Sequence, residues 1–463
     1  MRRAAATCFL LLLLTSFTCA ADATKAKNVI LMIGDGMGFN CHIAGSYYRF
    51  GKLGQQKVET FPVHVGMTTF CQKKQGVPIP AGEQGYDAAL FWRSPSGRDA
   101  GPNSVTTDSA AASTALHGGI KTVAGRIGMT DDKKPVTLIS QIADAAGRAT
   151  GAVTTVQACH ATPAGFSAHN ESRNNYGEIF IEQVEQSPLF VLIGVGHPQP
   201  TIGKGSDTEA YKYVGSEECW NKIVAESSQP PLQRKKFVRI LSSRNSLPPV
   251  DGVVPEPGRD AGDAEKELLR EYRIDTADGV PTLADVSVEA LDLLARKNAK
   301  GFVLMIEGGA IDHANHARNI RRSVYEHVAF MKSVEAVCDW VEKNSSWNET
   351  LLIVTADHET GSIWGPDTYE DENGNGVYDE GDTFNKLMPV VNNGIGKLPG
   401  VQYGSGSHSN ALVPLWAKGP GSTLFLDRVR GSDSRAAETW KFSGKYVDNT
   451  DVFNVMKEVL NSL

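Results

Sequence analysis

Short apolar runs alternate along this chain with stretches of helical periodicity. The apolar runs, which are bounded by glycine, proline and acidic residues, cover 28–33, 151–156, 189–193, 301–306, 351–355 and 412–417. Apolar residues at helical spacing cover 109–116, 136–146, 283–297 and 320–342. Because strands that alternate with helices form parallel sheets covered on both faces, we predict an α/β fold. Its core is a large, mostly parallel sheet sandwiched by helices.

The sequence predicts a signal peptide followed by one domain. Arg2 and Arg3 precede an apolar run at 8–17, and small residues near 20 offer cleavage points, so 1–20 is predicted to be a signal peptide. The remainder, 21–463, is predicted to be a single domain with polar insertions at about 201–262 and 366–407. We therefore expect a periplasmic or extracellular protein. No later run is long and apolar enough to span a bilayer, so no stable membrane anchor is expected.

Charge and cysteine content exclude several classes of function. The formal net charge of −7, without a basic cluster, argues against nucleic acid as a partner. Cys41, Cys71, Cys159, Cys219 and Cys338 would remain after cleavage, and this odd number leaves at least one thiol free or paired between chains. No Cys-x-x-Cys spacing occurs, so any bound metal must be held by Asp, Glu and His.

Acidic and histidine residues gather where the predicted strands end. Asp35 follows the first strand within a glycine-rich turn, Glu307 follows 301–306, and Asp357 precedes His358 after 351–355. Each alone is typical of a capped turn. Ligands in α/β folds bind at the carboxyl ends of the strands, so together they predict a metal site there.

A second group of ligand-type residues lies farther along the chain. Asp312 and His316 are four residues apart, so one helical turn can present both to one metal. His408 lies in a Gly/Ser-rich segment, which we interpret as a flexible loop, and it would supply the third ligand of a zinc site.

Ser109 lies between Asp108 and a run of small residues that favour a helix. A serine at a helix N-terminus lies where free backbone N–H groups and the helix dipole favour negative charge, so it can carry a phosphoryl group. Ser and Asp also cap ordinary helices, so the remaining motifs must decide between the two interpretations.

Six motifs occur here in the order found in alkaline phosphatases, and the chain resembles that family from about residue 28 to about 408. The motifs are Gly-Asp35-Gly-Met-Gly, Thr-Asp-Ser109-Ala-Ala, His160-Ala-Thr162-Pro-Ala, the segment from Glu307 to His316, Thr-Ala-Asp357-His358, and Gly-Ser-His408. The resemblance implies a secreted, homodimeric phosphomonoesterase that acts on small-molecule phosphate monoesters. It implies that Ser109 becomes phosphoserine and that Arg173 clamps phosphate through paired hydrogen bonds.

The same resemblance implies two zinc ions and one magnesium ion. Asp312, His316 and His408 would hold the zinc that activates water. Asp35, Asp357 and His358 would hold the second zinc, which lowers the pKa of Ser109. Asp35 would also bind magnesium, with Thr162 and Glu307.

Two positions depart from the enterobacterial pattern. His160 and His313, expected beside the ligands, replace an aspartate and a lysine and resemble animal and marine bacterial members. Whether the third site takes magnesium or zinc is therefore left open.

Other classes of function remain as alternatives. One is a relative that acts on phosphodiesters or sulfate esters, although Ser109 lacks the Cys/Ser-x-Pro-x-Arg context of sulfatases. Another is a non-enzymatic calcium-binding surface protein, which would have no need of Ser109 and Arg173. A comparison of a phosphate monoester, its diester and its sulfate would separate the three.

The segment 371–382 has the spacing of a calcium loop. Its ligand positions would be Asp371, Asn373, Asn375, Val377, Asp379 and Asp382. Glycine stands at loop position 6, as in EF-hands, but position 12 is Asp instead of the usual Glu. We predict a structural Ca²⁺ site without a helix–loop–helix. The alternative is an Asn/Gly-rich turn with solvated acids.

Overall fold

The computed structural model describes residues 25–72, 85–93, 106–195, 237–241, 281–372 and 382–461. The predicted signal peptide lies outside these residues, as do Cys219, most of 201–262, and Asn373, Asn375, Val377 and Asp379 of the predicted calcium loop. Within the described ranges, no helix combines the length and the apolar character that crossing a bilayer requires.

The centre of the molecule is a ten-stranded sheet with the strand order β15-β16-β2-β14-β7-β1-β6-β3-β4-β5. Its strands are β1 (Asn28–Gly34), β2 (Val63–Thr68), β3 (Ala149–Gln157), β4 (Val191–Val195), β5 (Phe237–Leu241), β6 (Phe302–Gly308), β7 (Thr350–Thr355), β14 (Val413–Lys418), β15 (Gly431–Ser432) and β16 (Lys445–Asp448). Strand β14 runs antiparallel to β2 and β7, and β15 to β16, whereas the other pairs are parallel. The predicted mostly parallel α/β sheet is confirmed.

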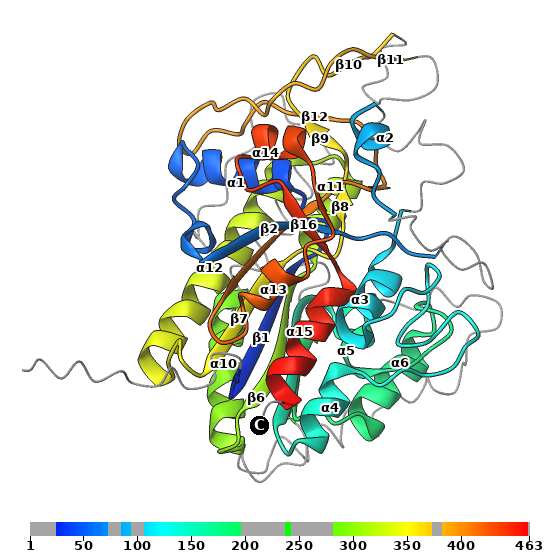
Figure 1. Ribbon diagram of the computed structural model, residues 1–463, viewed down its shortest axis with the longest axis vertical. Helices are drawn as coiled ribbons and strands as arrows, with labels where there is room; N and C mark the ends of the chain where they lie inside the picture. The colour runs from blue at the N-terminus through cyan, green and yellow to red at the C-terminus, as the bar shows by residue number, and fades with distance from the viewer. Residues whose placement is uncertain are drawn as a thin grey trace, which may run out of the picture.

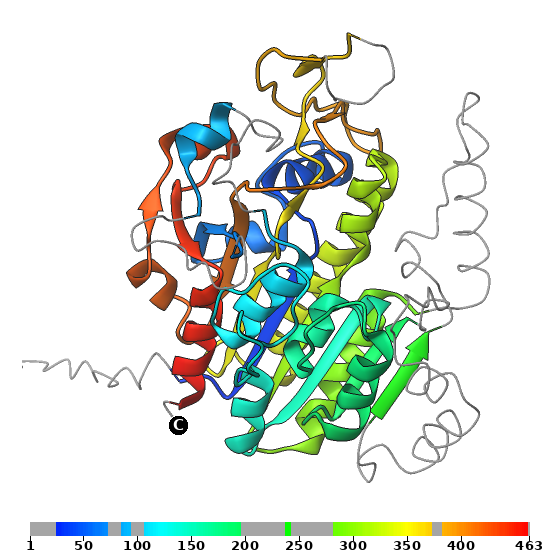
Figure 2. The same cartoon turned by 90° about the vertical axis from the view of Figure 1, so that its right-hand side faces the viewer.

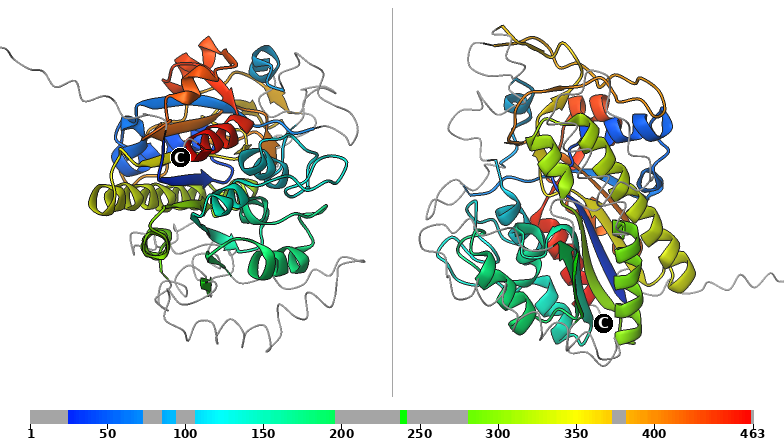
Figure 3. Two further views of the ribbon diagram at one scale, coloured as in Figure 1. Left: turned by 60° about the horizontal axis from the view of Figure 1, so that its bottom comes forward. Right: turned by 180° about the vertical axis from the view of Figure 1, so that it is seen from behind.

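Helices cover both faces of this sheet. On one face, α10 (Leu283–Lys297) contacts β3 and β6, and α12 (Ile320–Asn344) contacts β1 and β6. The other face carries α3 (Ser109–Gly118), α4 (Ile139–Ala145), α5 (Ala161–Ser167) and α15 (Thr450–Asn461). Figure 1 shows the two groups on opposite sides of β1, and the left view of Figure 3 shows α15 and α12 separated by this strand.

The described part of the chain contains further helical elements outside these two layers. They are α1 (Phe39–Phe50), η1 (Lys57–Thr60), α2 (Ala88–Arg93), α6 (Tyr176–Ile181), η2 (Glu182–Gln186), α11 (Ala310–His316), α13 (Leu424–Asp427) and α14 (Ser434–Trp440).

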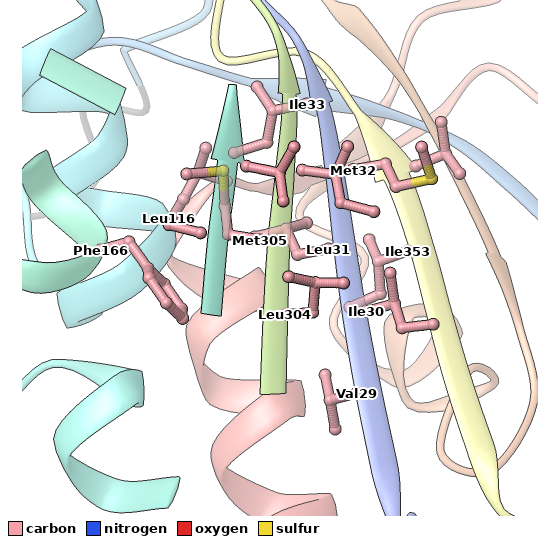
Figure 4. Close-up of a cluster of buried hydrophobic side chains, with 14 of the residues drawn as sticks. Val29, Ile30, Leu31, Met32, Ile33, Leu116, Phe166, Leu304, Met305 and Ile353 are labelled. Carbon is pink, nitrogen blue, oxygen red and sulfur yellow. The ribbon is translucent and has the colours of Figure 1, made fainter. Parts of the chain in front are cut away.

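The core forms where the apolar runs of neighbouring strands meet. All seven residues of β1 are buried, and Figure 4 shows its side chains among Leu304 and Met305 of β6 and Ile353 of β7. Leu116 of α3 and Phe166 of α5 close this cluster from one face. Burial of one such side chain stabilises the fold by about 1.5–3 kcal/mol, so the core fixes the strand ends on which the polar residues lie.

Three two-stranded ladders extend the fold beyond the sheet. They are β10 (Tyr369–Glu370) with β11 (Thr383–Phe384), β12 (Gln402–Tyr403) with β9 (Ile363–Trp364), and β13 (His408–Ser409) with β8 (Glu359–Thr360). The segment predicted as an insertion at 366–407 contains β10, β11 and β12, and Figure 2 shows β10 and β11 at the top of the molecule. His408 belongs to β13, so the expectation that it lies in a flexible loop is wrong. Pairing with Thr360 of β8 orders it.

Candidate active site

The ends of three neighbouring strands bring acidic side chains together. In the register of the sheet, Ile33 of β1 lies beside Glu307 of β6 and Thr355 of β7. Asp35 and Asp357 follow two residues after Ile33 and Thr355, so they meet Glu307 at one edge. Figure 1 places α11 and β8 at this end of the sheet. The sequence-based expectation of a site at the carboxyl ends of the strands agrees with this geometry.

The turn after β1 depends on Gly36. This residue has a φ of 71°, and a Cβ there would lie 2.8 Å from the Cα of Asp312 and from Thr360 Oγ1. Its backbone N–H donates to Asp357 Oδ1 over 3.1 Å. Only glycine allows α11 to approach the strand end this closely.

The structure brings Asp312, His316 and His408 close together. His316 Nε2 lies 3.2 Å from Asp312 Oδ2 and 3.1 Å from His408 Nε2, and His408 Nε2 lies 3.6 Å from Asp312 Oδ1. Helix α11 supplies Asp312 and His316 one turn apart, and β13 supplies His408 from nearly 100 residues later.

The second set contains Asp35, Asp357 and His358. His358 Nε2 lies 3.6 Å from Asp35 Oδ1 and 3.2 Å from Asp357 Oδ2, and all three side chains are fully buried. The two sets adjoin, because the rings of His358 and His408 stack with centroids 3.7 Å apart. His358 is consequently also within reach of a cation held by Asp312 and His408.

A third group forms around the other side of Asp35. Potential ligand atoms of Asp35, His160 and Glu307 lie within 4.8 Å of one another. Glu307 also accepts a 2.5 Å hydrogen bond from Thr154 of β3. Thr162, two residues after His160, is fully buried in the first turn of α5.

The hydrogen bonds of the histidines prepare them to bind metal. The Nδ1–H groups of His316 and His408 donate to the carbonyl oxygens of Gly406 and Thr107 over 2.8 and 2.7 Å. Because a carbonyl only accepts, Nδ1 carries the proton in each ring, and a neutral ring presents a free lone pair at Nε2. Two lone pairs that face each other over 3.1 Å are expected where a cation lies between them.

Thr360 fixes the protonation of the third ring, that of His358, in a similar way. Its hydroxyl donates to Asp312 Oδ1 over 2.5 Å and therefore accepts from Nδ1–H of His358 over 3.2 Å. Burial keeps His358 neutral by lowering its pKa well below the usual value, and the neighbouring His408 adds to this shift. Neutral imidazole is the form that binds metals.

The carboxylates also fit divalent cations. Burial raises the pKa of Asp357 to about 6 and that of Glu307 to about 7, and neighbouring carboxylates add to both shifts. Neither carboxylate oxygen of Asp35 has a hydrogen-bond partner among the residues that the structure describes. Buried charges are normally paired or bound to metal, so the carboxylate of Asp35 favours a bound cation. The donor set of oxygen and nitrogen atoms suits zinc and magnesium.

Ser109 is the first residue of α3 and is 1% exposed. Its Oγ lies 3.3 Å from His358 Nε2, at the edge of the second set. The backbone N–H groups of the first turn of α3 begin at this residue, so negative charge on Oγ is favoured there.

Arg173 lies in the turn before α6 and reaches toward the same point. Its Nη1 donates to Asp108 Oδ2 over 3.0 Å, and its Nη2 donates to His160 Nε2 over 3.2 Å. His160 therefore supports the arginine as well as facing Asp35. The ring of His313 meets that of His160 edge-on, with centroids 5.7 Å apart.

Sequence reasoning did not assign roles to Asp108, Thr154 and Thr360. Asp108 had a signal, because it precedes the predicted nucleophile at the position of a helix N-cap. Thr154 and Thr360 had none, since each contacts its partner only through the tertiary fold.

Comparison with known proteins identifies the family of this chain. The model of the alkaline phosphatase family matches residues 26–188 and 260–462. The chain belongs to the alkaline phosphatase family. Alkaline phosphatase 4 of Bacillus subtilis (strain 168) is 30% identical over 347 residues, covering 74% of this chain and 63% of that protein. The match thus spans less than two thirds of that relative.

Two further comparisons extend over more of this alkaline phosphatase family member. Streptomycin-6-phosphate phosphatase of Streptomyces griseus is 28% identical over 467 residues, covering 93% of this chain and 94% of that protein. The alkaline phosphatase of the Antarctic bacterium TAB5 has a similar fold, with a TM-score of 0.59 and 22% identity. That likeness covers 94% of this chain and 99% of the TAB5 chain.

Proposed function

We propose that this alkaline phosphatase family member hydrolyses phosphate monoesters through a phosphoserine at Ser109 and releases inorganic phosphate. The observation that carries the proposal is the position of Ser109 Oγ, which lies at a helix N-terminus and 3.3 Å from His358 Nε2. His358 belongs to two of three adjoining groups of potential metal ligands, and the guanidinium of Arg173 binds Asp108, the residue before Ser109. A metal-binding module without catalysis would need neither Ser109 nor Arg173 there.

Two zinc ions would be held by Asp312, His316 and His408 and by Asp35, Asp357 and His358. A magnesium ion would be held by Asp35, Thr162 and Glu307, with His160 close enough to join them. When bound, these ions supply Lewis-acid activation of the Ser109 hydroxyl and of water, and neutralise the charge of the phosphoryl group.

The residues of the chain perform the rest of the reaction. Arg173 holds two phosphoryl oxygens and orients the phosphorus atom toward Ser109. Ser109 Oγ forms a bond to phosphorus while the bond to the ester oxygen breaks, and the alcohol leaves with a proton. Water then attacks phosphorus from the opposite side, and the bond to Oγ breaks. The N-terminus of α3 stabilises the negative charge on Oγ in both steps.

We also propose that the protein is secreted to the periplasm or outside the cell and that it forms a homodimer. The resemblance of the whole motif set to alkaline phosphatases supports both proposals. The substrate is proposed at the level of a class, small-molecule phosphate monoesters. Streptomycin-6-phosphate phosphatase, a relative that matches nearly end to end, is named for one such compound.

The decisive experiment compares p-nitrophenyl phosphate, bis-p-nitrophenyl phosphate and p-nitrophenyl sulfate with zinc- and magnesium-loaded protein. We expect kcat/KM for the monoester to exceed the other two values by orders of magnitude. Ser109→Ala should remove the ³²P-labelled phosphoenzyme that is trapped at low pH, and most of the turnover. Ser434→Ala, which changes the exposed first residue of α14 after the N-cap Asp433, is the matched control and should retain the label.

Two results would reject the proposal. Preference for the diester would assign the protein to the phosphodiester branch of the superfamily. Turnover of the monoester at the wild-type rate by Ser109→Ala would exclude a phosphoserine at this position.

A further inference from the structure

The ladder of β8 and β13 joins two of the predicted zinc ligands. Strand β8 begins directly after His358, and β13 begins at His408. The register pairs Thr360 with His408 and Glu359 with Ser409. Each strand has two residues, and so short a ladder has little stability of its own. Additional contacts must therefore hold His408 at the site.

Glu359 supplies such a contact from a buried position. Its carboxylate accepts a short hydrogen bond from Ser409 Oγ and a 3.4 Å hydrogen bond from the backbone N–H of Ile363. Glu359 is 7% exposed and Ser409 is 1% exposed. Breaking a buried hydrogen bond leaves its groups unsatisfied, which costs free energy, so this pair ties β13 to β8 directly beside the two histidines.

The side chain of Glu359 occupies space that Gly38 leaves free. A Cβ on Gly38, the residue that precedes α1, would lie 2.3 Å from the Cγ of Glu359. The glycine-rich turn after β1 therefore makes room for this side chain. The same turn carries Asp35, so the glutamate is packed between the strand end of one predicted zinc ligand and the strand of another.

We propose that Glu359 and Ser409 form a clamp that positions His408 for zinc binding. The proposal rests on the proposed function in that the bound metal is zinc. Ser409 follows His408 directly, so fixing its hydroxyl sets how far the imidazole projects toward Asp312. The hydrogen bond from Nδ1–H to the carbonyl oxygen of Thr107 sets the rotation of the ring. The clamp and the carbonyl together fix the position of Nε2.

The test measures zinc retention, which a clamp of this kind changes directly. Zinc bound per protein is titrated against a chelator for wild type, Ser409→Ala, Glu359→Gln and Ser407→Ala. We expect Ser409→Ala to weaken the binding affinity for one of the two zinc ions by about 10- to 100-fold, the usual effect of removing a group that supports a metal ligand. Glu359→Gln keeps an acceptor and should lose less. Ser407→Ala removes an exposed hydroxyl on the other side of His408 and should retain zinc.

A double-mutant cycle with His408→Ala separates positioning from general stability. Once His408 is removed, loss of the Ser409 hydroxyl should not weaken zinc binding further. Ser409→Thr, which restores the hydroxyl, should restore zinc affinity. Glu359→Gln provides the same cycle if Ser409→Ala does not fold.

Each remaining outcome has one meaning. Wild-type zinc affinity in both Ser409→Ala and Glu359→Gln would overturn the clamp and leave the proposed function intact. Equal losses with and without His408 would also overturn it, because the effect would then pass through another residue. A wild-type protein that binds no zinc would overturn the proposed function, and the clamp with it.

Discussion

At the scale of single residues, Asp108 connects the proposed catalytic residues Ser109 and Arg173. One of its carboxylate oxygens caps α3 by accepting a hydrogen bond from the backbone N–H of Ala111. The other oxygen accepts hydrogen bonds from the backbone N–H of Gly125 and from Arg173. All three contacts are 3.0 Å long. Because Asp108 precedes Ser109, this carboxylate sets the distance between the proposed nucleophile and Arg173.

Arg173 is predicted to bind phosphate instead of transferring protons, since a guanidinium stays protonated throughout the accessible pH range. Arg173→Ala should raise the inhibition constant of inorganic phosphate by roughly 10- to 100-fold, because hydrogen bonds to charged groups contribute about 1.5–3 kcal/mol. Steady-state inhibition by phosphate measures this directly. Lys134→Ala removes an exposed cation elsewhere and is the control. Unchanged phosphate inhibition in Arg173→Ala would contradict the assignment.

At the scale of elements, a polar relay connects α3 with α5. Ser113 Oγ donates to the carbonyl oxygen of Thr162 over 2.7 Å and accepts from Nδ1–H of His117 over 2.9 Å. The helices lie so close that a Cβ on Gly165 would be 2.3 Å from Ser113 Oγ. The relay therefore fixes α5, whose first turn carries the predicted magnesium ligand, against α3, which carries the proposed nucleophile.

His117 makes this relay sensitive to acid. Burial lowers the pKa of His117 to about 3, whereas the unfolded chain takes up a proton near pH 6.5. The lowered folded-state pKa means that the contribution to stability is present above about pH 6.5 and is lost progressively as the pH falls toward 3. By linkage, this one residue should cost about 2 kcal/mol of unfolding free energy between about pH 7 and about pH 5.

The prediction is tested by chemical unfolding of metal-free protein across that pH range. His117→Asn does not titrate, so its unfolding free energy should fall by about 2 kcal/mol less than that of wild type. Ser113→Ala keeps the histidine and should retain the steep dependence. Identical slopes for wild type and His117→Asn would show that His117 does not contribute.

The sequence predicted the elements whose pattern is local. Five of the six apolar runs correspond to β1, β3, β6, β7 and β14 within a few residues, and 189–193 overlaps β4. Strands β2 and β16 were not predicted, because His64 and Gly66 interrupt the apolar pattern in β2 and β16 is short and begins with lysine. Helix α1 was not predicted either, since its sequence mixes polar and aromatic residues.

The residues of the candidate site likewise include some that the sequence predicted and some that it did not. Asp35, Ser109 and Asp357 lie in short motifs whose neighbouring residues indicate their role, so they could be predicted from the sequence. Thr360 contacts Asp312 only once α11 packs against β8, and Glu359 contacts Ser409 only once β13 pairs with β8. No spacing along the chain reports either contact, because 48 positions separate Thr360 from Asp312 and also from His408, its partner in the ladder.

At the scale of the whole molecule, the predicted calcium loop lies at the end of a ladder. Tyr369 pairs with Phe384 and Glu370 with Thr383, and the backbone N–H of Glu372 donates to Asp382 Oδ1 over 2.9 Å. The ends of the loop are thereby held together. This leaves the binding of Ca²⁺ as a proposal that the geometry of the two ends supports.

Calcium should raise the thermal midpoint of zinc-loaded protein, because a ligand that binds only the folded state stabilises it. Extracellular sites of this kind bind at about 10⁻⁴–10⁻³ M, so scanning calorimetry at millimolar calcium is appropriate. Asp371→Ala combined with Asp379→Ala should abolish the gain, and Asp427→Ala, an exposed acid elsewhere, should leave it intact. An equal response in the double variant would refute the site.

The position of β1 in the sheet has a consequence for how the chain acquires its structure during synthesis. This strand is made near the beginning, but both of its neighbours, β6 and β7, lie more than 250 residues later. Until those neighbours have emerged from the ribosome, the apolar residues of β1 have no sheet to join, and long-range pairings of this kind form slowly. We therefore expect nascent chains that end before β7 to need a holding chaperone and to be sensitive to protease.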